Sequence, residues 1–361
     1  MTKVFIVLLF LICKIEAYDA SFSEIIKETY TEYRQSKDDW CDRLSIQIHN
    51  IVEKYGKNVS FEELKQEGID PDYLDAMALE YCKKYADAYI AIVWPTLDAN
   101  YENMVYDILS QECLVAYKKT FTLERHAPKV LMESIPEKLP NIPFDFHCYF
   151  SPEKSTYEMR CFVIRAPDHA STVRAKRALR RIVKLDPYCM HINDTHDQAL
   201  DLAYMLLNNN SLHFLNSLER QQFKNFNSLF DLYTNFIKNS EIPKEEVCVD
   251  GSAVLSAYGL RDCALDFDFL CTRVADFGNI HPLDHHNIAW ERLGLSIEEV
   301  IYNPKNFFYY KGYKFASLLS IRNFKELQGR SNDLRDVALI DQMNRTFSLK
   351  KFNAFRSHRR K

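Results

Sequence analysis

One segment in the second half of the chain limits the possible folds more than any other. It runs from Glu246 to Leu270 and reads EVCVDGSAVLSAYGLRDCALDFDFL. Residues 247–249 predict a short buried strand, which the Gly251-Ser252 pair breaks before a stretch with helical spacing. A strand that enters a helix through Gly-Ser leaves unpaired N–H groups at the helix start, where a phosphate can bind. The Ser252 hydroxyl would add a further donor.

The same segment ends in a strand that alternates apolar and acidic residues. On such a strand Asp266 and Asp268 project from one face. Two carboxylates so placed repel each other, and a cation offsets the repulsion. Mg²⁺ and Mn²⁺ take oxygen ligands and also bind phosphate oxygens, so the pattern predicts metal-dependent phosphoryl or nucleotidyl transfer.

The two motifs together resemble a known signature. Gly251 and Ser252, followed after thirteen residues by Asp266-Phe267-Asp268, are similar to the Gly-Ser to Asp-x-Asp signature of the nucleotidyltransferase superfamily, which has the DNA polymerase β-like fold. The later stretch NFFYYKGYKFASLLSIRNFKELQGRSNDLRDVALI resembles the end of such domains, where a strand pair is followed by a helix. HINDTH and YGLRDC, followed by the acidic strand, are similar to glycan-modifying members and, more distantly, to choline-phosphate and fukutin-type transferases. The resemblance covers roughly residues 190–345.

The resemblance implies roles for individual residues. Asp266 and Asp268 would be metal ligands, and Gly251 and Ser252 would bind phosphate. The third carboxylate of the family, a general base or ligand, would be Asp284, with Asp276 as the second choice. Lys325 and Arg330 would either contact the donor phosphates or lie on a solvated face. His285 and His286 would carry a proton, bind the metal or have a hydrogen-bonded structural role.

Two functions are therefore expected as alternatives. The first is a metal-dependent transferase that moves a nucleotide or phospho-alcohol from a CDP- or UDP-type donor to a glycan-like hydroxyl. The second is a secreted, non-catalytic binding protein that retains the nucleotidyltransferase fold. A nucleic-acid partner is not expected, because 46 Lys and Arg against 50 Asp and Glu leave no basic excess to drive binding to a polyanion.

The beginning of the chain predicts entry into the secretory pathway. Lys3 precedes the apolar run from Val4 to Cys13, and small Ala17 follows, which is typical of a signal peptide over residues 1–17. The run is shorter than a membrane span, although an uncleaved anchor is the alternative, and no other transmembrane segment is expected. Four N-glycosylation sequons, at Asn58, Asn193, Asn209 and Asn344, agree with this route. We expect location in the ER or Golgi lumen or secretion, with disulfides among the nine remaining cysteines.

The overall expectation is an α+β fold. A helical region at 18–127 leads through a small α/β segment at 128–190 to a mixed-sheet nucleotidyltransferase-like domain at 191–345 and a basic tail at 346–361. Hydrophobic spacing predicts helices over 73–93 and 101–119, a strand over 157–164, and helices over 171–185 and 196–207.

Two features of the middle region have alternative interpretations. The helix at 171–185 carries six basic residues, which can meet phosphates or form a solvated face. His191, Asp194 and His196 can ligate a metal or start a helix, for which Thr195 and Gln198 form a capping box.

Overall fold

The computed structural model describes residues 61–133, 150, 154–185, 189–217, 223–262, 266–273, 277 and 280–358. These residues form an α+β protein, as predicted, with two separate sheets. The chain divides into two compact units, the first made of 1–122, 135–152 and 158–203 and the second of 123–134, 153–157 and 204–361. The predicted signal peptide, Asn58, Cys41, Cys148, Cys263 and Asp276 lie outside the described residues.

The first unit is built on a four-stranded sheet with the order β2-β3-β1-β4. Its strands are β1 (Ala88–Val93), β2 (Leu114–Glu124), β3 (Thr156–Arg165) and β4 (Met190–Ile192). Strand β1 pairs antiparallel with both β3 and β4. The helices of this region are α3 (Phe61–Gln66), α4 (Pro71–Lys84), α5 (Glu102–Glu112), α7 (His169–Val183) and α8 (His196–Leu206).

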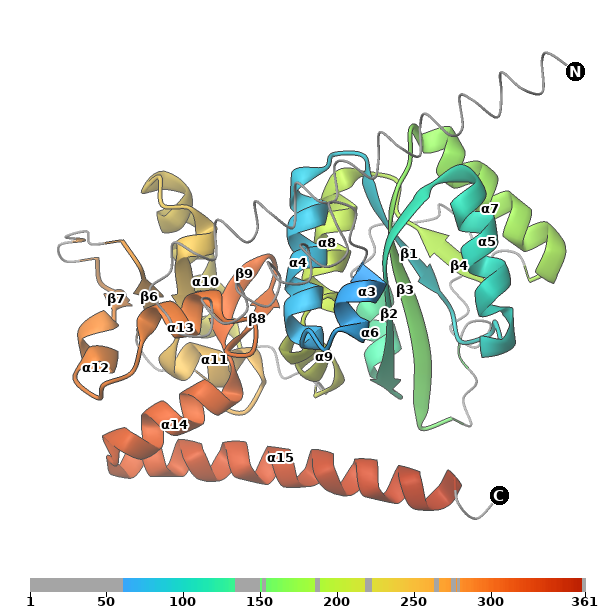
Figure 1. Cartoon of the computed structure of the whole chain (residues 1–361). Coiled ribbons are helices and arrows are strands. Elements are labelled where there is room, and N and C mark those ends of the chain that lie inside the picture. The colour runs from blue at the N-terminus through green and yellow to red at the C-terminus, as the bar shows by residue number, and fades with distance from the viewer. Residues whose placement is uncertain are drawn as a thin grey trace, which may run out of the picture. The chain divides into compact units, whose positions relative to one another are not determined.

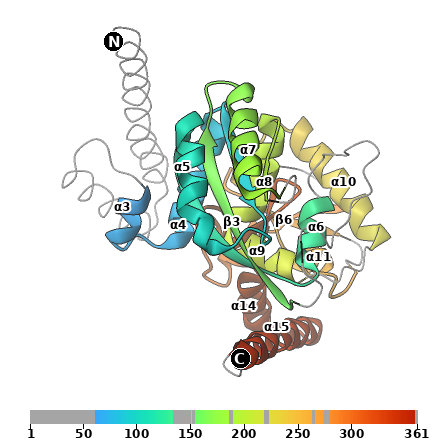
Figure 2. The same cartoon turned by 90° about the vertical axis from the view of Figure 1, so that its right-hand side faces the viewer.

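Helices cover both faces of this sheet. Figure 1 shows α5 and α7 on one face and α4 and α8 on the other, and in Figure 2 α5 and α7 lie in front of the strands. Apolar residues of α5 and α7 form one core with those of the strands, among them Leu109, Leu179, Phe162 and Ile192. The predicted strand at 157–164 and helices at 171–185 and 196–207 are confirmed within two residues.

Two of the predicted helices are wrong in their second halves. The helix expected over 73–93 ends at Lys84, and 88–93 forms the central strand β1. This strand is buried on both faces, so its sequence is a continuous apolar run, which spacing alone does not distinguish from a helix. The helix expected over 101–119 likewise ends at Glu112 and is followed by β2. The described part of 18–127 is thus not purely helical.

No disulfide joins two cysteines of the described residues. Free thiols occur there at Cys82, Cys113, Cys161, Cys248 and Cys271, and all of them are buried. The expected disulfides are therefore absent from this part of the chain. Burial raises the pKa of Cys82, Cys113, Cys161, Cys248 and Cys271, because a thiolate is poorly solvated in an apolar environment.

The second unit contains a mixed five-stranded sheet with the order β7-β6-β5-β9-β8. Its strands are β5 (Val247–Val249), β6 (Phe267–Cys271), β7 (Leu283–His285), β8 (Phe307–Tyr310) and β9 (Tyr313–Ala316). Strand β5 runs antiparallel to β6 and parallel to β9, while β6 and β7 are parallel. The chain thus forms the strand, Gly-Ser turn, helix and acidic strand that the sequence predicts.

Aromatic side chains form the core of this unit. Helix α10 (Lys224–Asn239) places Phe226, Phe230 and Tyr233 against Phe267 of β6. The other helices are α6 (Ala127–Glu133), α9 (Asn209–Asn216), α11 (Gly251–Ala257), α12 (Asn287–Glu291), α13 (Ile297–Tyr302), α14 (Leu318–Gln328) and α15 (Ser331–His358). Most of the predicted basic tail thus continues helix α15.

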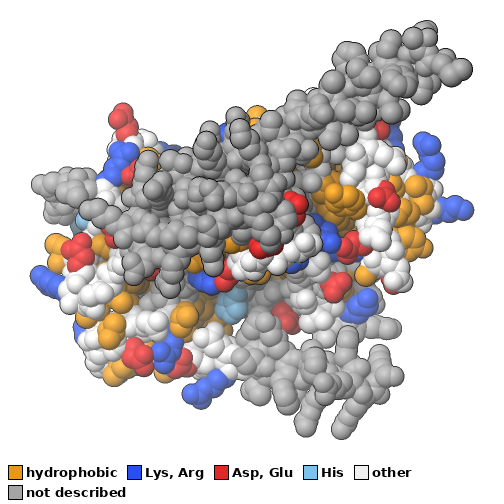
Figure 3. Space-filling model, in the orientation of Figure 1, with side chains coloured by type: hydrophobic (Ala, Val, Ile, Leu, Met, Phe, Trp, Pro, Cys, Tyr) orange, Lys and Arg blue, Asp and Glu red, His pale blue; other side chains and the backbone are white. Residues whose placement is uncertain are grey.

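No helix in the described part of the chain is long and apolar enough to cross a bilayer. On the face shown in Figure 3, basic and acidic side chains are interspersed among the coloured atoms, which agrees with the balanced charge of the sequence.

Candidate functional site

The Gly-Ser corner joins the end of β5 to helix α11. Gly251 has φ +61, in the left-handed region that favours glycine. A Cβ atom at this position would stand 1.9 Å from Oδ2 of Asp268. Glycine is therefore required by the approach of a carboxylate as well as by the backbone. Ser252 is largely buried, and its hydroxyl forms no hydrogen bond with any described residue.

The acidic strand lies next to this corner. Asp268 on β6 pairs in register with Asp284 on the parallel strand β7. Residues paired in this way point to the same face, with Cα atoms about 4.8 Å apart. Asp266 lies just before β6 and is exposed. The structure thus brings the predicted third carboxylate, Asp284, beside the second residue of the Asp-x-Asp motif.

Asp268 is in an unfavourable environment for a charged carboxylate. Burial, followed by the charge of Asp250 and by those of Asp266 and Asp284, raises its pKa to about 7, against a partial offset from His286. No described residue donates a hydrogen bond to its side chain. A carboxylate without donors, surrounded by like charges, is stabilised by a cation.

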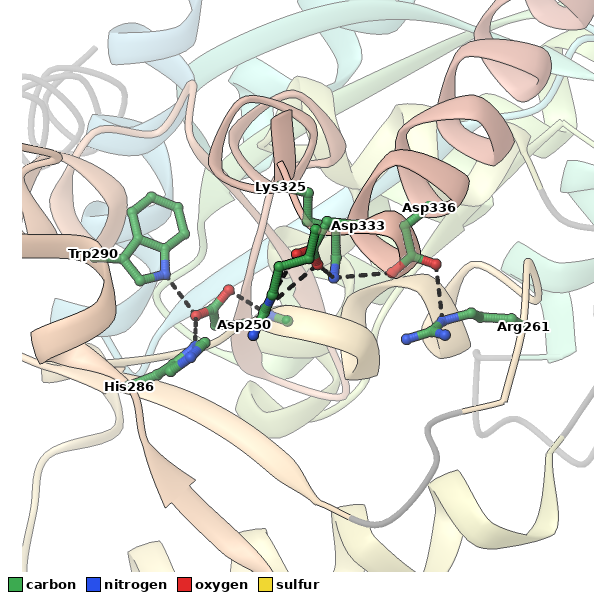
Figure 4. A network of polar contacts seen from close by, with 9 residues as sticks. Asp250, Arg261, His286, Trp290, Lys325, Asp333 and Asp336 are labelled. Carbon is green, nitrogen blue, oxygen red and sulfur yellow. Dashed lines mark hydrogen bonds and ion pairs between the residues drawn. The ribbon is translucent and has the colours of Figure 1, made fainter. Parts of the chain in front are cut away.

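Asp250 is the member of this cluster that sequence reasoning missed. It caps helix α11 and is completely buried, and Figure 4 shows its carboxylate between three donors. Oδ1 accepts a hydrogen bond from the backbone N–H of Gly251, while Oδ2 accepts from Trp290 Nε1 at 2.6 Å and from His286 Nδ1 at 2.9 Å. The sequence held a signal for it, since Asp before a helix start is a preferred capping residue.

The two adjacent histidines differ in their surroundings. The ring of His285 packs against Phe269 and Phe277, and burial lowers its pKa. Burial would also lower the pKa of His286, but the hydrogen bond and charge of Asp250, followed by the charge of Asp268, raise it to about 9. His286 is therefore an imidazolium at neutral pH and stands beside the carboxylates.

The predicted phosphate-binding cations lie in a second network, drawn in Figure 4. Lys325 on α14 is buried, and its Nζ lies 3.1 Å from Asp333 Oδ1 and 2.9 Å from Asp336 Oδ2. Its charge is thus neutralised within the protein. Arg330 pairs with Asp333 at 2.5 Å, but its side chain is 65% exposed and its charge also interacts with Asp268. Arg330 is the more available of the two for a ligand.

Arg261 does not neutralise the acidic motif. It forms an ion pair with Asp336 at 3.1 Å, between Arg261 Nε and Asp336 Oδ1, and not with Asp266 or Asp268. The Asp-x-Asp motif is therefore not neutralised by an ion pair with this arginine.

Asp194, Thr195 and Gln198 of the middle region have structural partners. Thr195 Oγ1 accepts from the N–H of Gln198, and Gln198 Oε1 accepts from the N–H of Thr195, so the capping box at the start of α8 is confirmed. Asp194 contacts Lys176 at 3.3 Å. On the basic helix α7, Arg174 pairs with Glu112 at 2.8 Å. Part of the positive charge of this helix is therefore balanced within the protein.

The acidic cluster suits a divalent cation in charge and ligand type, but it is not a complete ligand cage. Within the described residues, no group of three His, Cys, Asp or Glu side chains is arranged to hold a metal ion. Mg²⁺ commonly binds one or two carboxylates and completes its shell with water and substrate phosphate. Asp266 and Asp268 fit that mode of binding, in which the substrate supplies the missing ligands.

Comparisons with known proteins do not identify a relative. No family model, curated protein or solved structure matches the chain.

Proposed function

We propose that this protein is a metal-dependent nucleotidyl- or phospho-transferase of the secretory pathway. Its donor would be a CDP- or UDP-type compound and its acceptor a glycan-like hydroxyl. The observation that carries the proposal is the register pairing of Asp268 with Asp284 beside Gly251, in a carboxylate cluster where no described residue donates a hydrogen bond to Asp268. The resemblance of the sequence to nucleotidyltransferases supports the same reaction class.

Each residue of the site has a proposed role in the reaction. Asp266 and Asp268 would hold Mg²⁺ or Mn²⁺, which when bound neutralises charge on the transferred and leaving phosphates. Asp284 is exposed and can accept the proton of the attacking hydroxyl. The hydroxyl of Ser252 and the guanidinium of Arg330 would position the donor phosphates.

Calorimetry on the full chain tests the proposal. We expect binding of Mn²⁺ and of CDP or UDP compounds in its presence, and we expect Asp268→Asn to abolish both. Asp231→Asn, an exposed aspartate on α10, is the matched control and should bind as the wild type does. Absence of binding to the wild-type protein would refute the transferase proposal.

A non-catalytic binding protein is the second candidate. The observation in its favour is that the described residues contain no complete metal-ligand group. Such a protein would bind a nucleotide without consuming it. Incubation with the bound CDP or UDP compound and a glycan acceptor, followed by mass spectrometry, separates the two, because only the transferase yields a modified acceptor.

A further inference from the structure

The Asp250 carboxylate is committed to interactions within the protein. Both of its oxygens accept hydrogen bonds, and the side chain is fully buried. Among the described side chains, His286 is the one titratable cation that pairs with it. A buried carboxylate without a counterion is costly, so this ion pair keeps the imidazole protonated on both nitrogens. Because Nδ1–H donates to Asp250, Nε2 is the ring nitrogen that remains for a ligand, and in the protonated ring it carries an N–H donor.

The ring of His286 is also held by packing. The ring of Phe324 meets it edge-on at 5.5 Å between centroids, and Phe324 itself stacks on Trp290 at 4.6 Å. The backbone N–H of His286 donates to the carbonyl of Phe269 at 2.9 Å. Backbone, Nδ1 and ring face are thus all fixed before any ligand binds, which reduces the entropic cost of using this group for binding.

One polar atom of the ring remains available. Nε2 forms no hydrogen bond with any described residue, and the side chain is 22% exposed. The charges of Asp268 and Asp284 act on the same ring. In the proposed function a donor phosphate would bind close to these carboxylates. The fixed N–H group of His286 is a positively charged donor at that place.

We infer that His286 contacts a phosphate of the donor through Nε2–H, and that Asp250 is the positioning residue that holds the ring for this contact. This inference rests on the proposed function and adds to it a phosphate ligand that the sequence motifs do not identify. A charge-assisted hydrogen bond from a preorganised donor is the type of contact that stabilises developing phosphate charge.

The inference is tested by calorimetry on the full chain, which measures the binding of inorganic pyrophosphate in the presence of Mg²⁺. We expect His286→Gln to weaken pyrophosphate binding by about tenfold or more, as removal of one charge-assisted hydrogen bond does. Binding of Mn²⁺ alone should be retained, because the variant leaves Asp266 and Asp268 in place. His169→Gln, an exposed histidine of α7, should match the wild type.

The outcomes separate this inference from the proposed function. If Asp268→Asn abolishes pyrophosphate binding while His286→Gln leaves it unchanged, the role of His286 is refuted and the transferase proposal stands. If the wild type binds neither Mn²⁺ nor pyrophosphate, both are refuted.

A measurement on the wild-type protein covers the case in which His286→Gln does not fold. The Nε2 resonance of His286, assigned by NMR in ¹⁵N-labelled protein, should shift when pyrophosphate and Mg²⁺ are added together. An unchanged resonance at saturating pyrophosphate would overturn the inference. Asp250→Asn should weaken pyrophosphate binding and change this resonance even without ligand, because the ring loses its anionic partner.

Discussion

The carboxylate of Asp268 occupies the space that a side chain at Gly251 would need. A Cβ at Gly251 would stand 1.9 Å from Oδ2 of Asp268 and 2.8 Å from its Cγ. The glycine of the Gly-Ser turn and the second aspartate of the Asp-x-Asp motif are thus in direct steric contact. Their pairing in the sequence has a packing reason in addition to any role in phosphate binding.

This contact makes Gly251→Ala strongly destabilising. The methyl group would displace the carboxylate, and φ +61 would be strained for alanine, so we expect a loss of about 2 to 4 kcal/mol in the free energy of unfolding by urea. Gly294→Ala is the control, since φ is +71 there but no atom lies within 4 Å, and it should cost about 1 kcal/mol. Adding Asp268→Ala should recover part of the Gly251→Ala loss. Equal losses for both glycine variants would contradict the steric contact.

The raised pKa of Asp268 predicts a pH-dependent cost in stability. The folded protein binds a proton at Asp268 up to about pH 7, whereas the unfolded chain releases it near 3.8. The contribution of Asp268 to stability therefore falls as pH rises between these values. In the presence of a chelator, Asp268→Asn should increase the free energy of unfolding by about 1 to 3 kcal/mol at pH 8 and by less at pH 5. Asp231→Asn should show no such difference, and a pH-independent effect of Asp268→Asn would argue against the cluster.

Local patterns predicted the centre of the second unit well. The strand at 247–249, the break at Gly251 and the acidic strand depend on neighbouring residues, and the structure forms each of them. The capping box of Thr195 and Gln198 is equally local. The placement of Asp284 next to Asp268 came instead from the resemblance, because nothing in the intervening sequence determines that the two strands pair.

The parts that sequence reasoning missed depend on distant contacts. Strand β1 was read as a helix because burial on both faces removes the alternation that marks a strand. The partners of Asp250 lie 36 and 40 residues further along the chain, at His286 and Trp290. Lys325 was expected at a donor phosphate or on a solvated face, because its sequence context does not show that two aspartates of the next helix neutralise it.

Lys325 should therefore matter for stability. Lys325→Met would leave Asp333 and Asp336 buried with less positive charge nearby, which typically costs about 3 to 5 kcal/mol in the free energy of unfolding. Combining it with Asp333→Asn and Asp336→Asn should recover much of that loss, because the uncompensated charges are removed. Urea unfolding measures both effects. A fully stable Lys325→Met protein that has lost nucleotide binding would instead support the direct phosphate role.

Arg330 should show the opposite behaviour. Its side chain is 65% exposed and Asp333 keeps its contact with Lys325, so Arg330→Ala should lower the urea midpoint much less than Lys325→Met does. Its charge reaches Asp268, and the variant should therefore weaken pyrophosphate binding in the presence of Mg²⁺ by several-fold. Arg335→Ala on α15, also exposed, is the matched control. Unchanged pyrophosphate binding by Arg330→Ala would remove Arg330 from the proposed site.

The buried thiols provide a test of the redox state of the chain. Cys82, Cys161 and Cys248 are fully buried, and their pKa values lie above the ordinary value because burial disfavours the thiolate that reacts with alkylating agents. In the native protein we expect iodoacetamide to leave these three cysteines unmodified. In urea without reductant all three should be alkylated, because they are free thiols and no disulfide blocks the reaction. Peptide mass spectrometry identifies each modified site. A disulfide-linked peptide containing any of them would contradict the free thiols of the structure.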